Sequence, residues 1–142
     1  MSQQINSNSI IINTSSEKVW FALTNSSEVN KYLPSIKVVS GWELGSSIVY
    51  TYYDKAGKIY EWNGNPMVWT GVIKTLETNK ILAIDYTDQS QGVISESYTL
   101  ERLEKNSTKV TFTQTLVSPE MVENYKDGSQ HTLNALKKYL EN

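Results

Sequence analysis

Hydrophobic positions near the start of the chain follow first a strand and then a helix. Residues 4–13 read as a first strand, and the TSSE sequence after it fits a capping box, in which Thr14 caps a helix and Glu17 returns a hydrogen bond. We expect this helix to end near Asn25, and a second, shorter helix cannot continue past Pro34. The beginning of the chain therefore predicts one strand followed by two short helices.

The middle of the chain, from about residue 36 to residue 117, follows the alternation of β-strands. Five or six runs are separated by turn signals, of which Thr78-Asn79 suits a tight hairpin. In the last run the even positions from Val110 to Leu116 are mostly apolar, whereas the odd positions between them are threonines. This division predicts an antiparallel sheet with one buried and one solvated face.

The end of the chain predicts a long helix. Its start, SPE at 118–120, combines a capping serine, a proline at the first helical position and an acid beside the positive end of the helix dipole. Apolar spacing close to 3.6 residues then defines one stripe, made of Val122, Tyr125, Ser129, Leu133, Leu136 and Leu140. The small pair Gly128-Ser129 leaves two alternatives: a break after a helical turn at 119–126, or room beneath an unbroken helix.

The order of these elements places the chain in the α+β class. A run of antiparallel strands with helices segregated before and after it is typical of that class. The sequence contains no repeat, low-complexity tract or linker, and we therefore expect a single domain over residues 1–142.

The charges of the chain are nearly balanced. Thirteen lysines and arginines against fifteen acids leave a formal net charge of −2, which provides no basic surface for nucleic acid or an anionic membrane. No apolar run approaches the ~20 residues of a bilayer span. The absence of cysteine excludes disulfides, thiolate metal sites and cysteine nucleophiles. The start MSQQINSNSI lacks the basic and apolar regions of a signal peptide, and we expect a cytoplasmic protein.

Aromatic composition is the one bias in the chain. Nine tyrosines and four tryptophans stand against two phenylalanines. Strand propensity and half-buried sheet faces explain this bias without any ligand. The alternative is a cavity whose wall needs aromatic side chains that also form hydrogen bonds.

The single histidine, His131, does not have the position of a catalytic base. On a helix it shares a face with Asp127, Asn134 and Lys138, opposite the apolar stripe, and we therefore expect it in solvent. No motif for phosphate cradling, dinucleotide binding, a nucleophile elbow or zinc occurs. We therefore predict no catalytic residue, no metal ligand and no cofactor.

Glu96 is the most informative carboxylate, because it lies in register with Ile94, Tyr98 and Leu100. If that side of the strand points inward, Glu96 is an acid on an apolar wall, where its pKa is raised. It then either pairs with a neighbouring tyrosine, lies at the open end of the sheet, or contacts a ligand. Gln114 has the same alternatives, a position at the rim or an orienting hydrogen bond.

Three segments of the chain resemble a known superfamily. They are INTSSEKVWFALTNSSEVNKYLP, GVIKTLETNKILAIDYT, and STKVTFTQTL together with HTLNALKKYLEN. In order and spacing, from about residue 5 to 141, they resemble the helix-grip fold of the START-related, birch-pollen-allergen-like (SRPBCC) superfamily. Within it the sequence is similar to the branch named after the activator of heat-shock-protein ATPase (AHSA-like).

The resemblance implies a curved antiparallel sheet of six or seven strands around the long C-terminal helix, with a cavity between them. Members of the superfamily bind lipids, sterols, polyketides or other small apolar molecules, and a few branches are enzymes. Related sequences commonly have a tryptophan after the glycine near the start of the closing helix, where this chain has Ser129 after Gly128. The tryptophan that usually fills this position is therefore missing, and the sequence leaves the size of the cavity open.

Three functions remain as alternatives. The first is a protein that binds a small hydrophobic molecule, aromatic or lipid-like, through Tyr50, Tyr52, Trp69, Tyr86, Glu96, Tyr98, Phe112, Gln114, Tyr125, Ser129 and Leu133. The second, implied by the name of the branch, is a module that contacts a chaperone and stimulates its ATPase; it needs an exposed apolar patch. The third is a cyclase or hydrolase that works through Glu96 and the cavity tyrosines.

Overall fold

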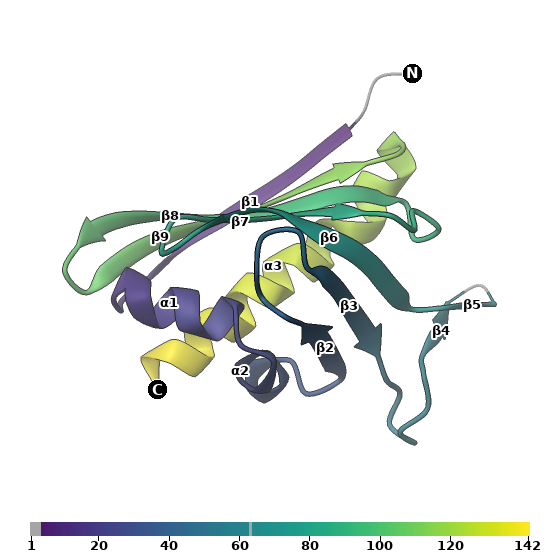
Figure 1. Ribbon diagram of the computed structural model, residues 1–142, viewed down its shortest axis with the longest axis horizontal. Helices are drawn as coiled ribbons and strands as arrows, with labels where there is room; N and C mark the ends of the chain where they lie inside the picture. The colour runs from purple at the N-terminus through teal and green to yellow at the C-terminus, as the bar shows by residue number, and fades with distance from the viewer. Residues whose placement is uncertain (1–3, 63) are drawn as a thin grey trace.

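The computed structural model describes residues 4–62 and 64–142 (Figure 1). The strand β1 (Gln4–Ile12) leads into two short helices, α1 (Ser16–Leu23) and α2 (Ser26–Tyr32), as predicted. The cap of α1 lies one residue after the predicted Thr14. Ser15 caps α1 by accepting a hydrogen bond from the amide of Lys18, and Asn25 caps α2.

Thr14 is not the cap, because it belongs to the turn that leaves β1. Its amide donates to the carbonyl oxygen of Ile12, and its own carbonyl oxygen accepts a hydrogen bond from the buried hydroxyl of Thr108. These backbone contacts place Thr14 in the turn before the helix, and the hydroxyl of the next residue, Ser15, caps it.

A seven-stranded sheet follows the order β1-β9-β8-β7-β6-β3-β2, and each pair of neighbours is antiparallel. The further strands of this sheet are β2 (Ile36–Ser40), β3 (Ser47–Tyr52), β6 (Val68–Glu77), β7 (Ile81–Tyr86), β8 (Val93–Glu104) and β9 (Ser107–Leu116). The short strands β4 (Glu61–Trp62) and β5 (Asn65–Pro66) form a separate pair. The predicted division of β9 is confirmed, since its even positions are buried.

The long helix α3 (Pro119–Glu141) is continuous, and the predicted alternative of a break after 119–126 is wrong. A glycine costs a helix about 1 kcal/mol relative to alanine, which the burial of Leu133 and Leu136 exceeds. Figure 1 shows α3 lying across the same face of the sheet as α1 and α2. Within the described ranges, no helix combines the length and apolarity needed to cross a membrane.

Two irregularities adjust the inner face of the sheet. A register shift between Val93 and Ser95 turns Val93 inward, where it is 1% exposed, so the predicted inward register of Ile94 is wrong. On β6, a Cβ at Gly71 would lie 2.7 Å from the carbonyl oxygen of Asp85 and 3.0 Å from Cδ1 of Tyr86. Only glycine therefore allows Tyr86 to pack where it does.

Candidate ligand-binding site

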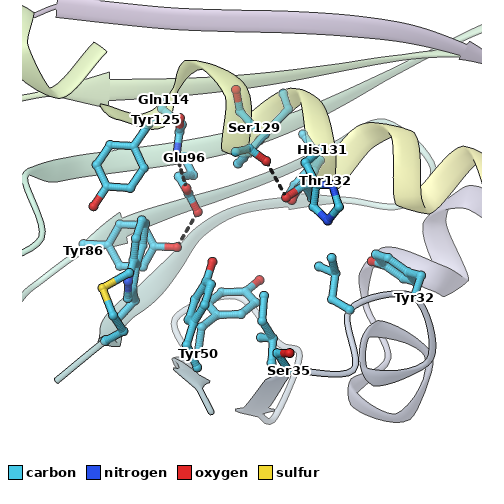
Figure 2. A pocket seen from close by; sticks show the side chains of 18 of the residues that line it. Tyr32, Ser35, Tyr50, Tyr86, Glu96, Gln114, Tyr125, Ser129, His131 and Thr132 are labelled. Carbon is cyan, nitrogen blue, oxygen red and sulfur yellow. Dashed lines mark hydrogen bonds between the residues drawn. The ribbon is translucent and has the colours of Figure 1, made fainter. Parts of the chain in front are cut away.

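A cavity of about 370 Å³ lies between the inner face of the sheet and the N-terminal half of α3 (Figure 2). Side chains from β3, β6, β7, β8, β9 and α3 form its wall. Ten of the eleven predicted site residues line it: Tyr50, Tyr52, Trp69, Tyr86, Glu96, Tyr98, Phe112, Gln114, Tyr125 and Ser129. Side chains at alternate positions of each strand point to the same face of the sheet, and the curvature of the sheet brings them together around the cavity. That they bind a ligand stays a prediction.

Leu133 is the exception, because it lies in the core. It is fully buried and packs in a cluster with Leu136 and with Val19 and Ala22 of α1. One turn of α3 separates it from Ser129, and at that turn α1 fills the space beneath the sheet. The spacing of the helix correctly predicted the buried side of Leu133, but the packing of α1 excludes it from the cavity.

The mouth of the cavity contains residues that sequence reasoning did not assign to the site. They are the segment from Tyr32 to Ile36, Met67 beside β6, and Gly128, His131 and Thr132 on α3. His131 is exposed as expected, but it also borders the cavity, which the prediction of an idle solvated face missed. The reason is that α3 crosses the opening, and residues beside its buried stripe therefore lie along the edge.

Aromatic rings pack against one another along the wall. The ring of Trp69 stacks on Tyr52 at a centroid distance of 6.1 Å, and it meets Tyr86 and Tyr125 nearly edge-on at 5.5 Å each. Tyr98 and Phe112 stack at 4.4 Å. Such offset and edge-on contacts stabilise aromatic clusters beyond simple burial. The wall is therefore shaped by rings that support one another.

A polar chain crosses this aromatic wall at Glu96. Tyr86 donates its hydroxyl to Oε1 of Glu96 at 2.5 Å, and Gln114 donates Nε2 to Oε2 at 2.7 Å (Figure 2). Asn6 donates Nδ2 to Oε1 of Gln114 at 3.0 Å. Because the amide oxygen of Gln114 is occupied by Asn6, its NH₂ group must face the carboxylate. Of the predicted alternatives, Glu96 pairs with a tyrosine. Gln114 is buried and not at the rim, and that it orients a ligand stays a prediction.

Ser129 joins this chain to α3. Its Oγ accepts hydrogen bonds from Nδ2 of Asn6 at 3.0 Å and Nδ2 of Asn8 at 2.5 Å, and it donates to the carbonyl oxygen of Lys126 at 3.1 Å. The hydroxyl is thus fully used, as a buried polar group requires. Asn6 and Asn8 were missed, although they share the parity of the inward-facing Ile10 and Ile12 along β1, which was a usable signal.

The pKa values of the cavity residues are shifted because one carboxylate is enclosed among tyrosine hydroxyls. Burial raises the pKa of Glu96, although the hydrogen bonds from Tyr86 and Gln114 oppose that rise. Burial, and then the charge of Glu96, raises the pKa of Tyr125 to about 12 and the pKa values of Tyr50, Tyr52, Tyr86 and Tyr98 further. The tyrosines therefore remain neutral hydrogen-bond donors at physiological pH. No group of described residues has the ligands for a metal ion.

A curved antiparallel sheet that grips a long C-terminal helix over a cavity defines the helix-grip fold of the SRPBCC superfamily. The family model for Activator of Hsp90 ATPase homolog 1-like protein matches residues 13–141, and the chain belongs to this family. No curated protein matches the sequence significantly.

Solved structures share the fold of this chain. ChR145 from Cytophaga hutchinsonii is 27% identical, with 99% of this chain and 97% of that chain covered and a TM-score of 0.75. The Aha1 dimer from Colwellia psychrerythraea is 24% identical, with 97% of this chain and 96% of that chain covered and a TM-score of 0.72. The Zhui aromatase/cyclase from Streptomyces sp. R1128 is 16% identical, with 99% of this chain and 94% of that chain covered and a TM-score of 0.76. The last two likenesses concern the fold alone.

Proposed function

We propose that the protein binds a small, largely apolar molecule with a ring in the cavity beneath α3. The observation that carries this proposal is the cavity itself, about 370 Å³ of space lined by aromatic side chains around a single carboxylate. Ligand sites in proteins have volumes of roughly 300–1,000 Å³ and combine apolar walls with few polar groups. A filled core would have favoured the protein-interaction alternative instead.

The expected affinity is modest. A ligand the size of an aromatic side chain buries roughly 200 Å², which contributes about 5 kcal/mol before the costs of association. Flat rings can stack on the rings of the wall, and tyrosine hydroxyls can orient one polar substituent. We therefore expect dissociation constants from a few hundred micromolar to the millimolar range for small aromatic compounds.

The test is a titration of the ¹⁵N-labelled protein with a panel of flavonoids, sterols and aromatic compounds, followed by NMR. We expect shifts confined to the cavity, including the amides of Gly128 and Thr132 and the indole NH of Trp69. The blocking variant is Gly128→Trp, which adds an indole at a residue of the cavity wall where a Cβ meets nothing within 4 Å. The matched control is Asp127→Trp, one residue along the helix and outside the cavity wall.

Gly128→Trp should weaken binding at least about tenfold, while Asp127→Trp should leave it unchanged. If no member of the panel perturbs the cavity residues, or if both variants bind like the parent protein, the proposal is wrong.

A second candidate function is stimulation of a chaperone ATPase by direct contact. The family match favours it, because the family is described by likeness to an activator of the Hsp90 ATPase. Exposed apolar side chains such as Phe21, Val39 and Leu44 could contribute to a contact surface. The ATPase rate of Hsp90 with and without the protein tests it. An unchanged rate eliminates this candidate, and stimulation that survives Gly128→Trp would separate it from ligand binding.

A further inference from the structure

The carboxylate of Glu96 is held by hydrogen-bond donors. Each of its oxygens accepts one hydrogen bond, from Tyr86 and from Gln114. The amide of Gln114 cannot rotate to offer its oxygen to a protonated Glu96, because that oxygen already accepts from Asn6. These two donors favour the anionic form of the acid and oppose the effect of burial on its pKa, and each oxygen still has a lone pair for a further donor.

Within the described part of the chain, no positive side chain compensates this anion. The residues that line the cavity include neither lysine nor arginine. The ion pairs of the described residues lie elsewhere. Figure 2 shows His131 beside Thr132, whereas Glu96 lies near Gln114, Tyr86 and Tyr125. An enclosed charge without a partner is costly, and a ligand that brings a positive charge would remove that cost.

The aromatic wall suits the same kind of ligand. The charge of Glu96 contributes, after burial, to the raised pKa values of five cavity tyrosines, which places all of them within its field: Tyr50, Tyr52, Tyr86, Tyr98 and Tyr125. The negative faces of such rings attract organic cations, and the attraction increases when the cation leaves water. A neutral ligand would use the hydrogen-bond acceptor only, and an anionic ligand would be repelled.

We infer that the cavity selects an organic cation, a protonated amine on an aromatic or apolar body, whose charge lies beside Glu96 within the ring of tyrosines. This inference rests on the proposed function, because it specifies the ligand of the same cavity. It also separates the lipid-like alternatives: fatty acids and other carboxylates are disfavoured at neutral pH, whereas amines of the same size are preferred.

Three probes that share a phenyl ring test the charge. They are 2-phenylethylammonium, the neutral 2-phenylethanol and the anionic phenylacetate, each titrated at pH 7 by NMR. We expect the cation to bind about tenfold more tightly than the alcohol, since an ion pair and a cation–π contact are added. Phenylacetate should bind more weakly than the alcohol.

The substitution Glu96→Gln should abolish the preference by weakening the binding of the cation much more than that of the alcohol, because the glutamine oxygen can still accept a hydrogen bond from a hydroxyl. Binding of the alcohol then also shows that the variant is folded. Glu101→Gln, an exposed site on the same strand, is the matched control for net charge and should keep the preference.

Equal binding of the three probes overturns the inference, and so does a preference that survives Glu96→Gln. If a neutral ring compound occupies the cavity while 2-phenylethylammonium does not bind, the inference is wrong and the proposed function stands. If no ring compound of any charge binds, both are wrong.

Discussion

The helix α3 covers two unlike halves of the inner face of the sheet. Under its C-terminal half, Leu133 and Leu136 are fully buried and pack against β9 and α1, in what we call the filled half. Under its N-terminal half, Tyr125 and Ser129 face the cavity, and we call this the cavity half. The strands β8 and β9 run through both halves, so the same backbone supports two different interiors.

The contrast arises within a few residues of the same strands. Leu100 pairs with Val110 in the filled half, whereas Glu96 pairs with Gln114 in the cavity half. Aliphatic side chains interdigitate at high density and stabilise the fold by burial. Tyrosine and glutamate require hydrogen bonds instead, and the rigid rings of the tyrosines leave part of the space unfilled. Tight packing and open space therefore lie in neighbouring parts of one sheet.

The largest effect is expected from creating a cavity in the filled half. Leu136→Ala removes a fully buried side chain and should lower the free energy of unfolding by about 2–5 kcal/mol. Urea denaturation measures this loss. Ligand binding by the folded fraction should be unchanged, and a loss below about 1 kcal/mol would show that the filled half is not tightly packed.

A smaller loss of stability is expected from breaking the chain of polar side chains in the cavity half. Ser129→Ala removes the acceptor for Asn6 and Asn8, and burying unpaired donors costs about 1–3 kcal/mol. Ser7→Ala is the control, because that hydroxyl contacts Thr113 on the exposed face; surface changes of this kind stay within about 0.5 kcal/mol. Equal effects of the two variants in urea denaturation would contradict the importance of the network.

A gain in stability is expected from a substitution at Gly128, at the mouth of the cavity. Gly128→Ala adds a methyl group that meets nothing within 4 Å in a helical position. Alanine should therefore raise the free energy of unfolding by up to about 1 kcal/mol. Thermal denaturation checks this gain, and a lower melting temperature would show that the helix needs the glycine.

The smallest effect is a dependence of stability on pH. Because the pKa of Glu96 is raised above its ordinary value of 4.5, the folded state holds this proton more tightly than the unfolded state. Its contribution to stability is therefore present at low pH and is lost as the pH rises from 4.5 through the raised value. Glu96→Gln has no such loss, and its melting temperature relative to the parent protein should rise toward neutral pH.

The control for this pH dependence is Glu101→Gln, which removes the same charge from an exposed position on the same strand. A difference between Glu96→Gln and the parent protein that does not change between pH 4 and pH 8 would mean that Glu96 titrates as it does in the unfolded chain.

Local patterns in the sequence determined the elements of the fold and the direction of most site residues. The alternation along β9 correctly separated its buried from its solvated positions. These predictions succeed because the spacing of side chains in a strand or helix depends only on the backbone. The resemblance to the family supplied the arrangement of the elements around the closing helix.

The volume of the cavity and the composition of its mouth were decided only by the tertiary structure. Leu133 and Ser129 lie on one stripe of α3, yet α1 fills the space beside Leu133 and leaves the space beside Ser129 open. Asn6 comes from the opposite end of the chain to orient the amide next to Glu96. Such contacts join residues more than a hundred positions apart. The spacing of apolar residues within one helix or strand carries no information about how far that element lies from another one.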